Sequence, residues 1–257
     1  MTESPAALRR RFAAGDSPAT TAGLARGFVQ ANLAVVPRDV ADEFLAWCMA
    51  NPKPCPVLGV GGRSIPELGV TDIARELPRY RVWRNGEVAD APTDVADLWR
   101  DDLVSVALGC SYSFDDALAA AGVRLRHVEQ HINPPIYTSS LETRAVGRFS
   151  GKLIVAARPI ARDQVVRAVA VTARYPLAHG APVHVGDPRA IGIDPDAPTN
   201  GSPLRPEANE LAVFWACGVT PETALRTARL PFAITHFPGA MLLTDLRLET
   251  LLDRAAA

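Results

Sequence analysis

The chain has 257 residues, 48% of them hydrophobic, and a formal net charge of −1 at pH 7. This composition supports a packed core, and its interspersed acids and bases exclude a basic nucleic-acid face or a polybasic membrane anchor, so small solutes are the expected partners. No apolar run reaches the ~20 residues that cross a bilayer, and no signal sequence follows the arginines at 9–11, which predicts a soluble cytoplasmic protein.

Helical and extended elements alternate along the chain. A short helix running into an extended segment is predicted over 20–36, and a second helix from there to Ala50. A hairpin is predicted to turn at Asn85-Gly86. Near-continuous apolar runs predict buried strands at 103–108, 152–157 and 211–216.

The second half of the chain is less regular. A helix is predicted at about 161–173, followed by a proline-rich, loop-rich tract over 174–210. The segment A-I-T-H-F-P-G-A-M-L-L-T-D near the C-terminus is predicted to form two strands around a turn at Pro238-Gly239.

These elements predict an α/β fold, in which a mixed sheet is flanked by helices and a smaller α+β sub-domain is inserted. The division that we expect places residues 1–108 and 210–257 in the main unit and residues 109–209 in the inserted unit. The four cysteines show neither a C-x-x-C pair nor the density of a disulfide scaffold, so free thiols are expected.

Two segments share one pattern, G-C-S-Y-S-F-D-D-A-L at 109–118 and A-C-G-V-T-P-E-T-A-L at 216–225. Each places a cysteine, Cys110 or Cys217, where a buried strand ends and a helix begins. A thiol at a helix N-terminus has a lowered pKa, so two such thiols facing one cleft would work as an acid and base pair. The alternative is convergence, in which both cysteines are small buried residues at tight turns.

The hydroxyl residues of these two corners are candidate anion ligands. The first N–H groups of a helix lack partners and attract negative charge. Ser111, Ser113 and Thr220 are therefore predicted to help bind a substrate carboxylate, which makes a small acidic metabolite the expected partner. Whether the protein forms a homo-oligomer is left open.

The tract H-G-A-P-V-H-V-G-D-P at 179–188 gathers histidines among glycine and proline. Because histidine titrates near neutral pH, His184 with Asp187 is the predicted acid–base pair, and His236 is a second candidate. His179 is a candidate substrate contact; alternatively it caps a turn, and Asp187 stabilises the G-D-P bend. The spacing matches no metal signature, so no cofactor is predicted and a divalent metal stays open.

These motifs together resemble the putative hydro-lyase family related to D-glutamate cyclase. The resemblance covers nearly the whole chain and is carried by T-A-G-L-A-R-G-F-V-Q-A-N-L, N-P-K-P-C-P, L-P-R-Y-R-V, G-C-S-Y-S-F, R-F-S-G-K-L-I-V, H-G-A-P-V-H-V-G-D-P, V-F-W-A-C-G-V-T-P and I-T-H-F-P-G-A-M-L-L-T-D. The chain departs from the family pattern at Asp115, where Glu is usual, and at P-P-I-Y-T-S-S, which replaces P-M-Y-x-T. The resemblance implies an α/β architecture with two sub-structures and a carbon–oxygen lyase that eliminates water.

The reaction associated with that family is cyclodehydration of D-glutamate to 5-oxo-D-proline. Such a reaction needs a base to free the α-amine, donors for the oxyanion and an acid to release water. In this hypothesis His184 with Asp187 moves protons, and Arg144 or Arg158 holds the α-carboxylate. Two alternatives stay open: a two-cysteine racemase or epimerase of an acidic amino acid, and a non-catalytic binding protein for an acidic metabolite.

Overall fold

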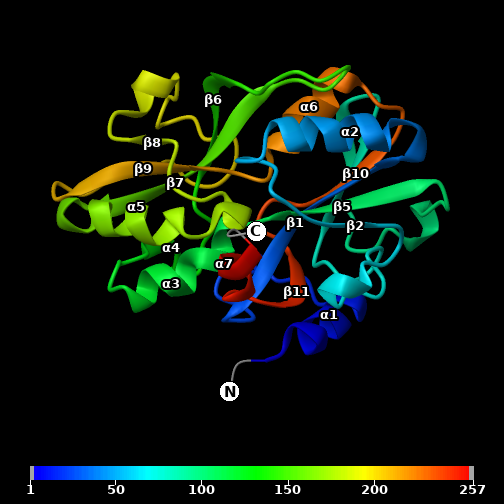
Figure 1. Ribbon diagram of the computed structural model, residues 1–257, viewed down its shortest axis with the longest axis horizontal. Helices are drawn as coiled ribbons and strands as arrows, with labels where there is room; N and C mark the ends of the chain where they lie inside the picture. Colours follow the sequence, from blue (N-terminus) through cyan, green and yellow to red (C-terminus); the bar gives the residue numbers. More distant parts are fainter. Residues whose placement is uncertain (1–2, 255–257) are drawn as a thin grey trace.

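Two antiparallel sheets form the framework of the computed structural model, which describes residues 3–254 (Figure 1). Helices pack around both sheets, and the predicted α/β class is confirmed. The helices within this range are α1 (Pro5–Ala13), α2 (Arg38–Ala50), α3 (Asp115–Ala120), α4 (Arg126–Glu129), α5 (Val165–Ala173), α6 (Thr220–Ala228) and α7 (Thr250–Arg254).

The larger sheet contains seven strands. Their order is β2 (Val57–Gly61), β5 (Leu103–Gly109), β1 (Phe28–Pro37), β10 (Ala233–His236), β3 (Tyr80–Arg84) and β4 (Glu87–Asp90), and β11 (Leu242–Arg247) also pairs with β1. The central strand β1 is buried along nearly its whole length, as its apolar sequence requires. The hairpin β3–β4 turns at Asn85-Gly86, as predicted.

The smaller sheet contains β6 (Ile136–Glu142), β7 (Lys152–Ala161), β9 (Glu210–Ala216) and β8 (His184–Val185) in that order. Strand β9 pairs with β7 and β8, although the expected division assigned residues from 210 onward to the main unit. The predicted buried strands at 103–108, 152–157 and 211–216 are confirmed as β5, β7 and β9.

Two expectations were wrong, one about a helix and one about the direction of the paired strands. Residues 20–27 form turns rather than a helix, with left-handed backbone at Gly23, Ala25 and Gly27 that a helix does not accept. The strand pairs within residues 3–254 are all antiparallel, so neither sheet is mixed. In open parallel sheets, ligands bind at the carboxyl ends of the strands, but that rule does not extend to antiparallel sheets such as these.

The C-terminal segment forms the two expected strands around a turn at Pro238-Gly239, but the two strands do not pair with each other. Strands β10 and β11 both pair antiparallel with β1, at Ala34–Val35 and at Phe28–Ala31 respectively. They therefore run in one direction along the same edge of β1, separated by the irregular segment 237–241. This interruption lies opposite the middle of β1 and leaves room there for a cavity.

Residues alternate between the two faces of the large sheet with the period of two that strands impose. Ala34 and Val36 of β1 pack with α2 and α6 on one face. Leu33 and Val35 pack on the other face in a core that includes Trp215 of β9. The second core joins the two sheets into one body, so residues that end strands in different sheets come close together.

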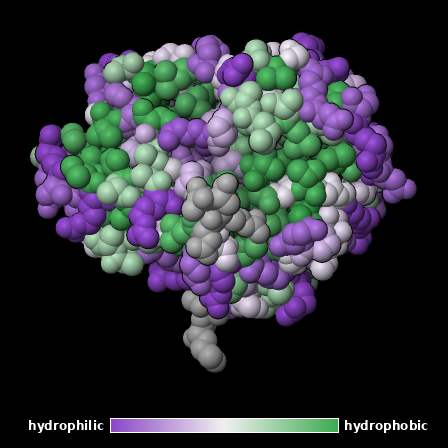
Figure 2. Space-filling model, in the orientation of Figure 1, coloured by the Kyte–Doolittle hydropathy of each residue, from purple (hydrophilic) through white to green (hydrophobic). Residues whose placement is uncertain are grey.

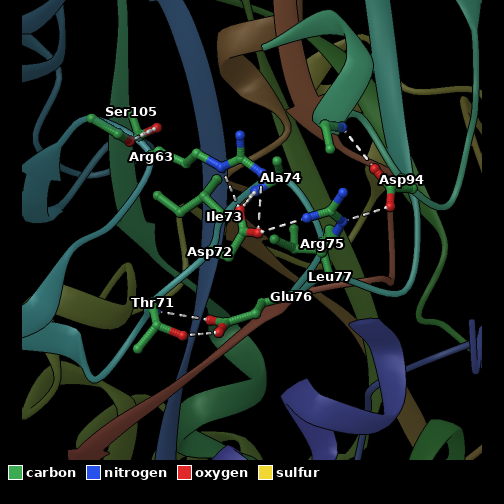
Figure 3. A network of polar contacts seen from close by, with 12 residues as sticks. Arg63, Thr71, Asp72, Ile73, Ala74, Arg75, Glu76, Leu77, Asp94 and Ser105 are labelled. Carbon is green, nitrogen blue, oxygen red and sulfur yellow. Dashed lines mark hydrogen bonds and ion pairs between the residues drawn. The ribbon is translucent and has the colours of Figure 1, made fainter. Parts of the chain in front are cut away.

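The long connection between β2 and β3 is ordered by apolar side chains inside and ion pairs outside (Figure 3). Ile65 and Ile73 are fully buried in the central core. Arg63 donates to both carboxylate oxygens of Asp72, at 2.8 and 3.1 Å, and Arg75 Nε donates to Asp94 at 3.1 Å. These contacts hold the connection against the face of the large sheet that carries Leu33 and Val35, without a helix of more than one turn.

On the face drawn in Figure 2, hydrophobic areas are broken up by hydrophilic residues. The most exposed large apolar side chains, Met49 at 71% and Val166 at 80%, lie on separate helices, α2 and α5. Single exposed apolar side chains are normal on a soluble surface and need no partner to explain them.

Replacing Gly109 by alanine should destabilise the fold. A Cβ at Gly109 would overlap the Leu177 carbonyl oxygen, which is backbone and cannot swing away. We expect Gly109→Ala to lower the free energy of unfolding by about 2 kcal/mol or more, as overpacking does. Gly62→Ala, where a Cβ meets only open space, is the control and should change it by less than about 0.5 kcal/mol in denaturant titrations. Equal effects would contradict this packing.

Candidate functional site

A small cavity lies where the two sheets meet, with a volume of about 30 Å³. That volume holds about two water molecules. Its walls come from strand ends of both sheets and from the segment that separates β10 from β11. The polar and sulfur-bearing residues that line it are Asn32, Cys110, Ser111, Tyr112, Asn133, His179, Asn200, Cys217, His236 and Met241.

The two corners with the shared pattern face this one cavity. Cys110 follows β5 of the large sheet and Cys217 follows β9 of the small sheet, and both line the cavity. The expected lowering of their pKa is wrong. Burial raises the pKa of Cys217 to about 11 and that of Cys110 further still, because a thiolate loses its hydration there. Both side chains are therefore neutral thiols at pH 7.

The acids of the two corners form reciprocal ion pairs across the sheets. Asp115, in the corner after β5, accepts a hydrogen bond of 3.2 Å from Arg158 Nη2 of β7 in the small sheet. Glu222, in the corner after β9, accepts one of 2.5 Å from Arg81 Nη1 of β3 in the large sheet. Each corner is thus held by an arginine from the opposite sheet.

Each pair has a second partner. His127 Nε2 lies 2.8 Å from the other oxygen of Asp115, and both side chains are buried. Thr235 Oγ1 donates to Glu222 Oε1 at 3.2 Å. Burial raises the pKa of Glu222 to about 7 against the opposing effect of Arg81.

His236 brings a ring nitrogen without a partner to the cavity. Its Nδ1 lies 3.2 Å from the Leu33 backbone nitrogen and 3.3 Å from the Leu33 carbonyl oxygen, so it accepts from the first or donates to the second according to the tautomer. Within residues 3–254, Nε2 has no partner although it is buried. Burial lowers the pKa of His236 to about 4, which keeps the ring neutral at pH 7.

His179 brings a hydrogen-bond acceptor to the cavity. Its Nδ1 lies 2.9 Å from the Lys53 carbonyl oxygen, and an imidazole nitrogen can only donate to a carbonyl. The lone pair is therefore on Nε2, as an acceptor. Burial lowers the pKa of His179 to about 4. Its backbone is left-handed, with φ of 76°, and the residue lines the cavity.

The predicted pair of His184 and Asp187 does not form at this site. His184 lies on the edge strand β8, and its Nε2 lies 2.8 Å from the backbone carbonyl of Asp187, not from its carboxylate. The Asp187 carboxylate instead accepts from the Arg189 N–H at 3.0 Å and caps a short turn. Neither residue lines the cavity.

Three candidate anion ligands serve the backbone or the surface instead. Ser113 Oγ bonds both the N–H and the carbonyl of Gln30, at 3.0 and 3.1 Å. Thr220 Oγ1 donates to the Cys217 carbonyl at 2.7 Å and accepts from the Ile154 N–H. Arg144 is exposed. Among the predicted substrate ligands, Ser111 and His179 line the cavity.

The sequence reasoning missed the amides and one phenol of the site. Asn32, Asn133 and Asn200 line the cavity, and Tyr112 donates to Asn133 Oδ1 at 2.8 Å. A polar Asn in the buried run of β1 was the available signal, because a buried amide needs a partner or a ligand. Asn32 Nδ2 donates to the Gly109 carbonyl at 2.6 Å.

The described part of the chain shows neither a metal cluster nor a membrane-crossing helix. In residues 3–254 no three His, Cys, Asp or Glu side chains are arranged to hold a metal ion. Over the same range no helix has the length and apolar content needed to span a bilayer. The cysteines in this range are all free, as expected.

A profile of the D-glutamate cyclase family matches residues 104–245, which include both corners and both cavity histidines. The chain belongs to this family. Related proteins named putative hydro-lyase are 49% identical in Bradyrhizobium diazoefficiens, over 98% of this chain and 96% of the relative, and 52% identical in Rhodococcus jostii, over 96% and 95%. A third, from Methylobacterium sp. strain 4-46, is 52% identical over 91% and 88%.

Among solved structures, the crystal structure of a nitrogen repressor-like protein from Methanococcus jannaschii aligns with 90% of this chain and 92% of its own. The identity is 11% and the TM-score is 0.41. A likeness of that size supports no statement about this member of the D-glutamate cyclase family.

The buried neutral histidines should make the fold sensitive to acid. Because the folded pKa of His236 is about 4 and the unfolded value is about 6.5, the unfolded state binds the proton first as pH falls. The contribution of the neutral His236 ring to the free energy of unfolding is therefore complete above pH 6.5 and is lost between pH 6.5 and 4. Between pH 7 and 5 the wild type should therefore lose about 2 kcal/mol more unfolding free energy than the His236→Gln variant does. Parallel pH profiles in urea titrations would contradict this assignment.

Proposed function

We propose that the cavity eliminates water from a small acidic amino acid, and that the specific reaction is cyclodehydration of D-glutamate to 5-oxo-D-proline. The observation that carries the proposal is the pair of histidines in one cavity. His179 Nε2 is an acceptor, and we assign to His236 the tautomer in which Nδ1 accepts from the Leu33 N–H and Nε2, which has no partner within residues 3–254, carries the proton. Membership of the D-glutamate cyclase family and the hydro-lyase names of the relatives support the same reaction class.

The reaction assigns one role to each histidine. The amine nitrogen attacks the γ-carboxyl carbon, forming the C–N bond, while His179 Nε2 accepts a proton from the nitrogen. His236 Nε2–H donates to the oxyanion that develops on the γ-carboxyl oxygen. The C–O bond then breaks. The substrate ammonium loses two protons in all, and both leave on the departing oxygen as water.

The thiols have a defined place in this scheme. Because burial keeps Cys110 and Cys217 protonated at pH 7, they can deliver a proton to the departing oxygen but are poor bases. Because both thiols are uncharged at pH 7, they do not repel the carboxylates of the substrate.

Substrate entry requires part of the wall to move. A cavity of about 30 Å³ holds about two waters, far less than an amino acid. The segment 130–135 contributes Asn133 and Pro134 to the wall and is irregular in structure. Its hydrogen bond from Tyr112 to Asn133 is the contact that opening would break.

Substitution of His179 tests the proposal. We expect His179→Gln to lower kcat for 5-oxo-D-proline formation by about 10²–10⁴-fold, because the base is lost. His184→Gln is the matched control, since that histidine lies outside the cavity, and it should retain kcat within about threefold. Product is followed by proton NMR. Near-normal turnover by a folded His179→Gln variant would reject the role of this residue.

A racemase is the second candidate, because the two thiols line one cavity from different sheets. In that reaction one sulfur removes the α-proton and the other returns a proton to the opposite face. We expect exchange of the glutamate α-proton in deuterated water if this candidate is right, abolished by Cys110→Ser or by Cys217→Ser alone. Since the pKa of Cys217 is about 11, the exchange rate should rise with pH above 7. Ring closure without α-proton exchange would exclude it.

A further inference from the structure

We infer that Ser111 is a catalytic hydrogen-bond donor in this cavity and that Arg158 is the residue that positions it. The inference rests on the proposed function, because it names the group that acts on the γ-carboxyl oxygen together with His236. It also changes the role of Arg158, which was expected to hold the substrate α-carboxylate directly. Arg158 is not among the residues that line the cavity.

The hydrogen bonds of Ser111 leave its proton unused. The side chain lines the cavity, and its Oγ accepts a hydrogen bond of 3.0 Å from Arg158 Nη2. A hydroxyl that accepts on one side still has its own proton to donate. Within residues 3–254 the Ser111 hydroxyl donates no hydrogen bond to a protein atom, and its partner is the donor Arg158 Nη2. The O–H is therefore free to point at a ligand in the cavity.

Arg158 is held through Nη2 and by two aromatic rings, and this placement defines where Ser111 Oγ lies. Its Nε and Nη1 have no hydrogen-bond partner within residues 3–254. It is 1% exposed and projects from β7 on the same face as Ala156, which lines the cavity. Its guanidinium lies 5.4 Å from the ring centres of both Phe114 and Trp215. Asp115 accepts from Nη2 at 3.2 Å.

The chain of contacts ends at a buried histidine. His127 Nε2 lies 2.8 Å from Asp115 Oδ2, so the carboxylate that holds Arg158 is itself held. A charged donor shortens and strengthens the hydrogen bond to the serine oxygen and draws electron density from it. The polarised O–H is then a better donor to a developing oxyanion. The sequence His127, Asp115, Arg158 and Ser111 leads from the interior to the reacting oxygen.

The second corner has no equivalent of the hydrogen bond between Arg158 and Ser111. Gly218 occupies the position that matches Ser111 in the shared pattern, and a side chain there would overlap Asn32. The second donor that the proposed reaction places in the cavity is His236 Nε2–H, whose nitrogen has no partner in the described part of the chain. In this inference Ser111 and His236 act together on one oxygen, in the manner of an oxyanion hole.

Single substitutions at Ser111 test the donor role. We expect Ser111→Ala to lower kcat for 5-oxo-D-proline formation by about 10²–10³-fold, as loss of one oxyanion donor does, and to raise KM by about tenfold, because the hydroxyl also holds the γ-carboxylate before it reacts. Ser111→Thr retains the hydroxyl and should recover kcat to within about tenfold of the wild type. Ser113→Ala is the matched control on the same turn, because that hydroxyl bonds the Gln30 backbone, and it should keep kcat within about threefold. A change of less than twofold in Ser111→Ala would overturn the inference.

The positioning role is tested by combining variants. If Arg158 acts through Ser111, Arg158→Lys should lower kcat in the wild-type background but by less than about threefold in the Ser111→Ala background. A purely structural role for Arg158 would instead multiply the two losses. Should the Arg158→Lys variant fail to fold, Ser111→Ala and Ser111→Thr decide the donor role on their own.

Binding of glutarate separates this inference from the proposed reaction. Glutarate has two carboxylates and no amine, so it cannot cyclise. We expect calorimetry to show that the wild type binds glutarate and that Ser111→Ala binds it at least tenfold more weakly. That result without any turnover of D-glutamate would leave Ser111 as a ligand donor and reject the cyclase. No binding to the wild type, or equal binding by both proteins, would overturn the role of Ser111.

Discussion

The buried ion pair between Arg158 and Asp115 is the contact on which the site depends. It joins β7 of the small sheet to the corner after β5 of the large sheet, and Arg81 with Glu222 makes the reciprocal connection. Burying charged groups costs several kcal/mol each unless they are paired and hydrogen-bonded, so such pairs are better explained by the geometry that they fix than by net stability. Here that geometry brings two thiol-bearing corners to one cavity.

The same burial sets the chemical state of the cavity. Because water is excluded, charged forms are disfavoured: the pKa of each thiol rises and the pKa of each histidine falls to about 4. Neutral groups can then act by the direction of their hydrogen bonds. His179 accepts because its Nδ1 is committed to the Lys53 carbonyl. In the proposed reaction His236 donates through Nε2 while its Nδ1 accepts from the Leu33 N–H. An interior of this kind stabilises charge only where the substrate develops it.

Much of the fold could be predicted from sequence, because apolar runs and turn residues are local signals. The strands β5, β7 and β9, the Asn85-Gly86 hairpin and the paired cysteine corners are examples. Pairing partners are not local, and for that reason the sequence did not show that β9 pairs with β7 and β8, or that β10 and β11 each pair with β1. The His184 and Asp187 pair failed for the same reason: closeness in sequence on an edge strand did not bring them to the cavity.

The central claim is that the cavity between the two corners is the active site, and a crystal structure of the protein with glutarate tests it most directly. Our account predicts a carboxylate oxygen within hydrogen-bond distance of both Ser111 Oγ and His236 Nε2, with the segment 130–135 displaced from its present place. Glutarate bound elsewhere, with the cavity between Cys110 and Cys217 still closed, would contradict it.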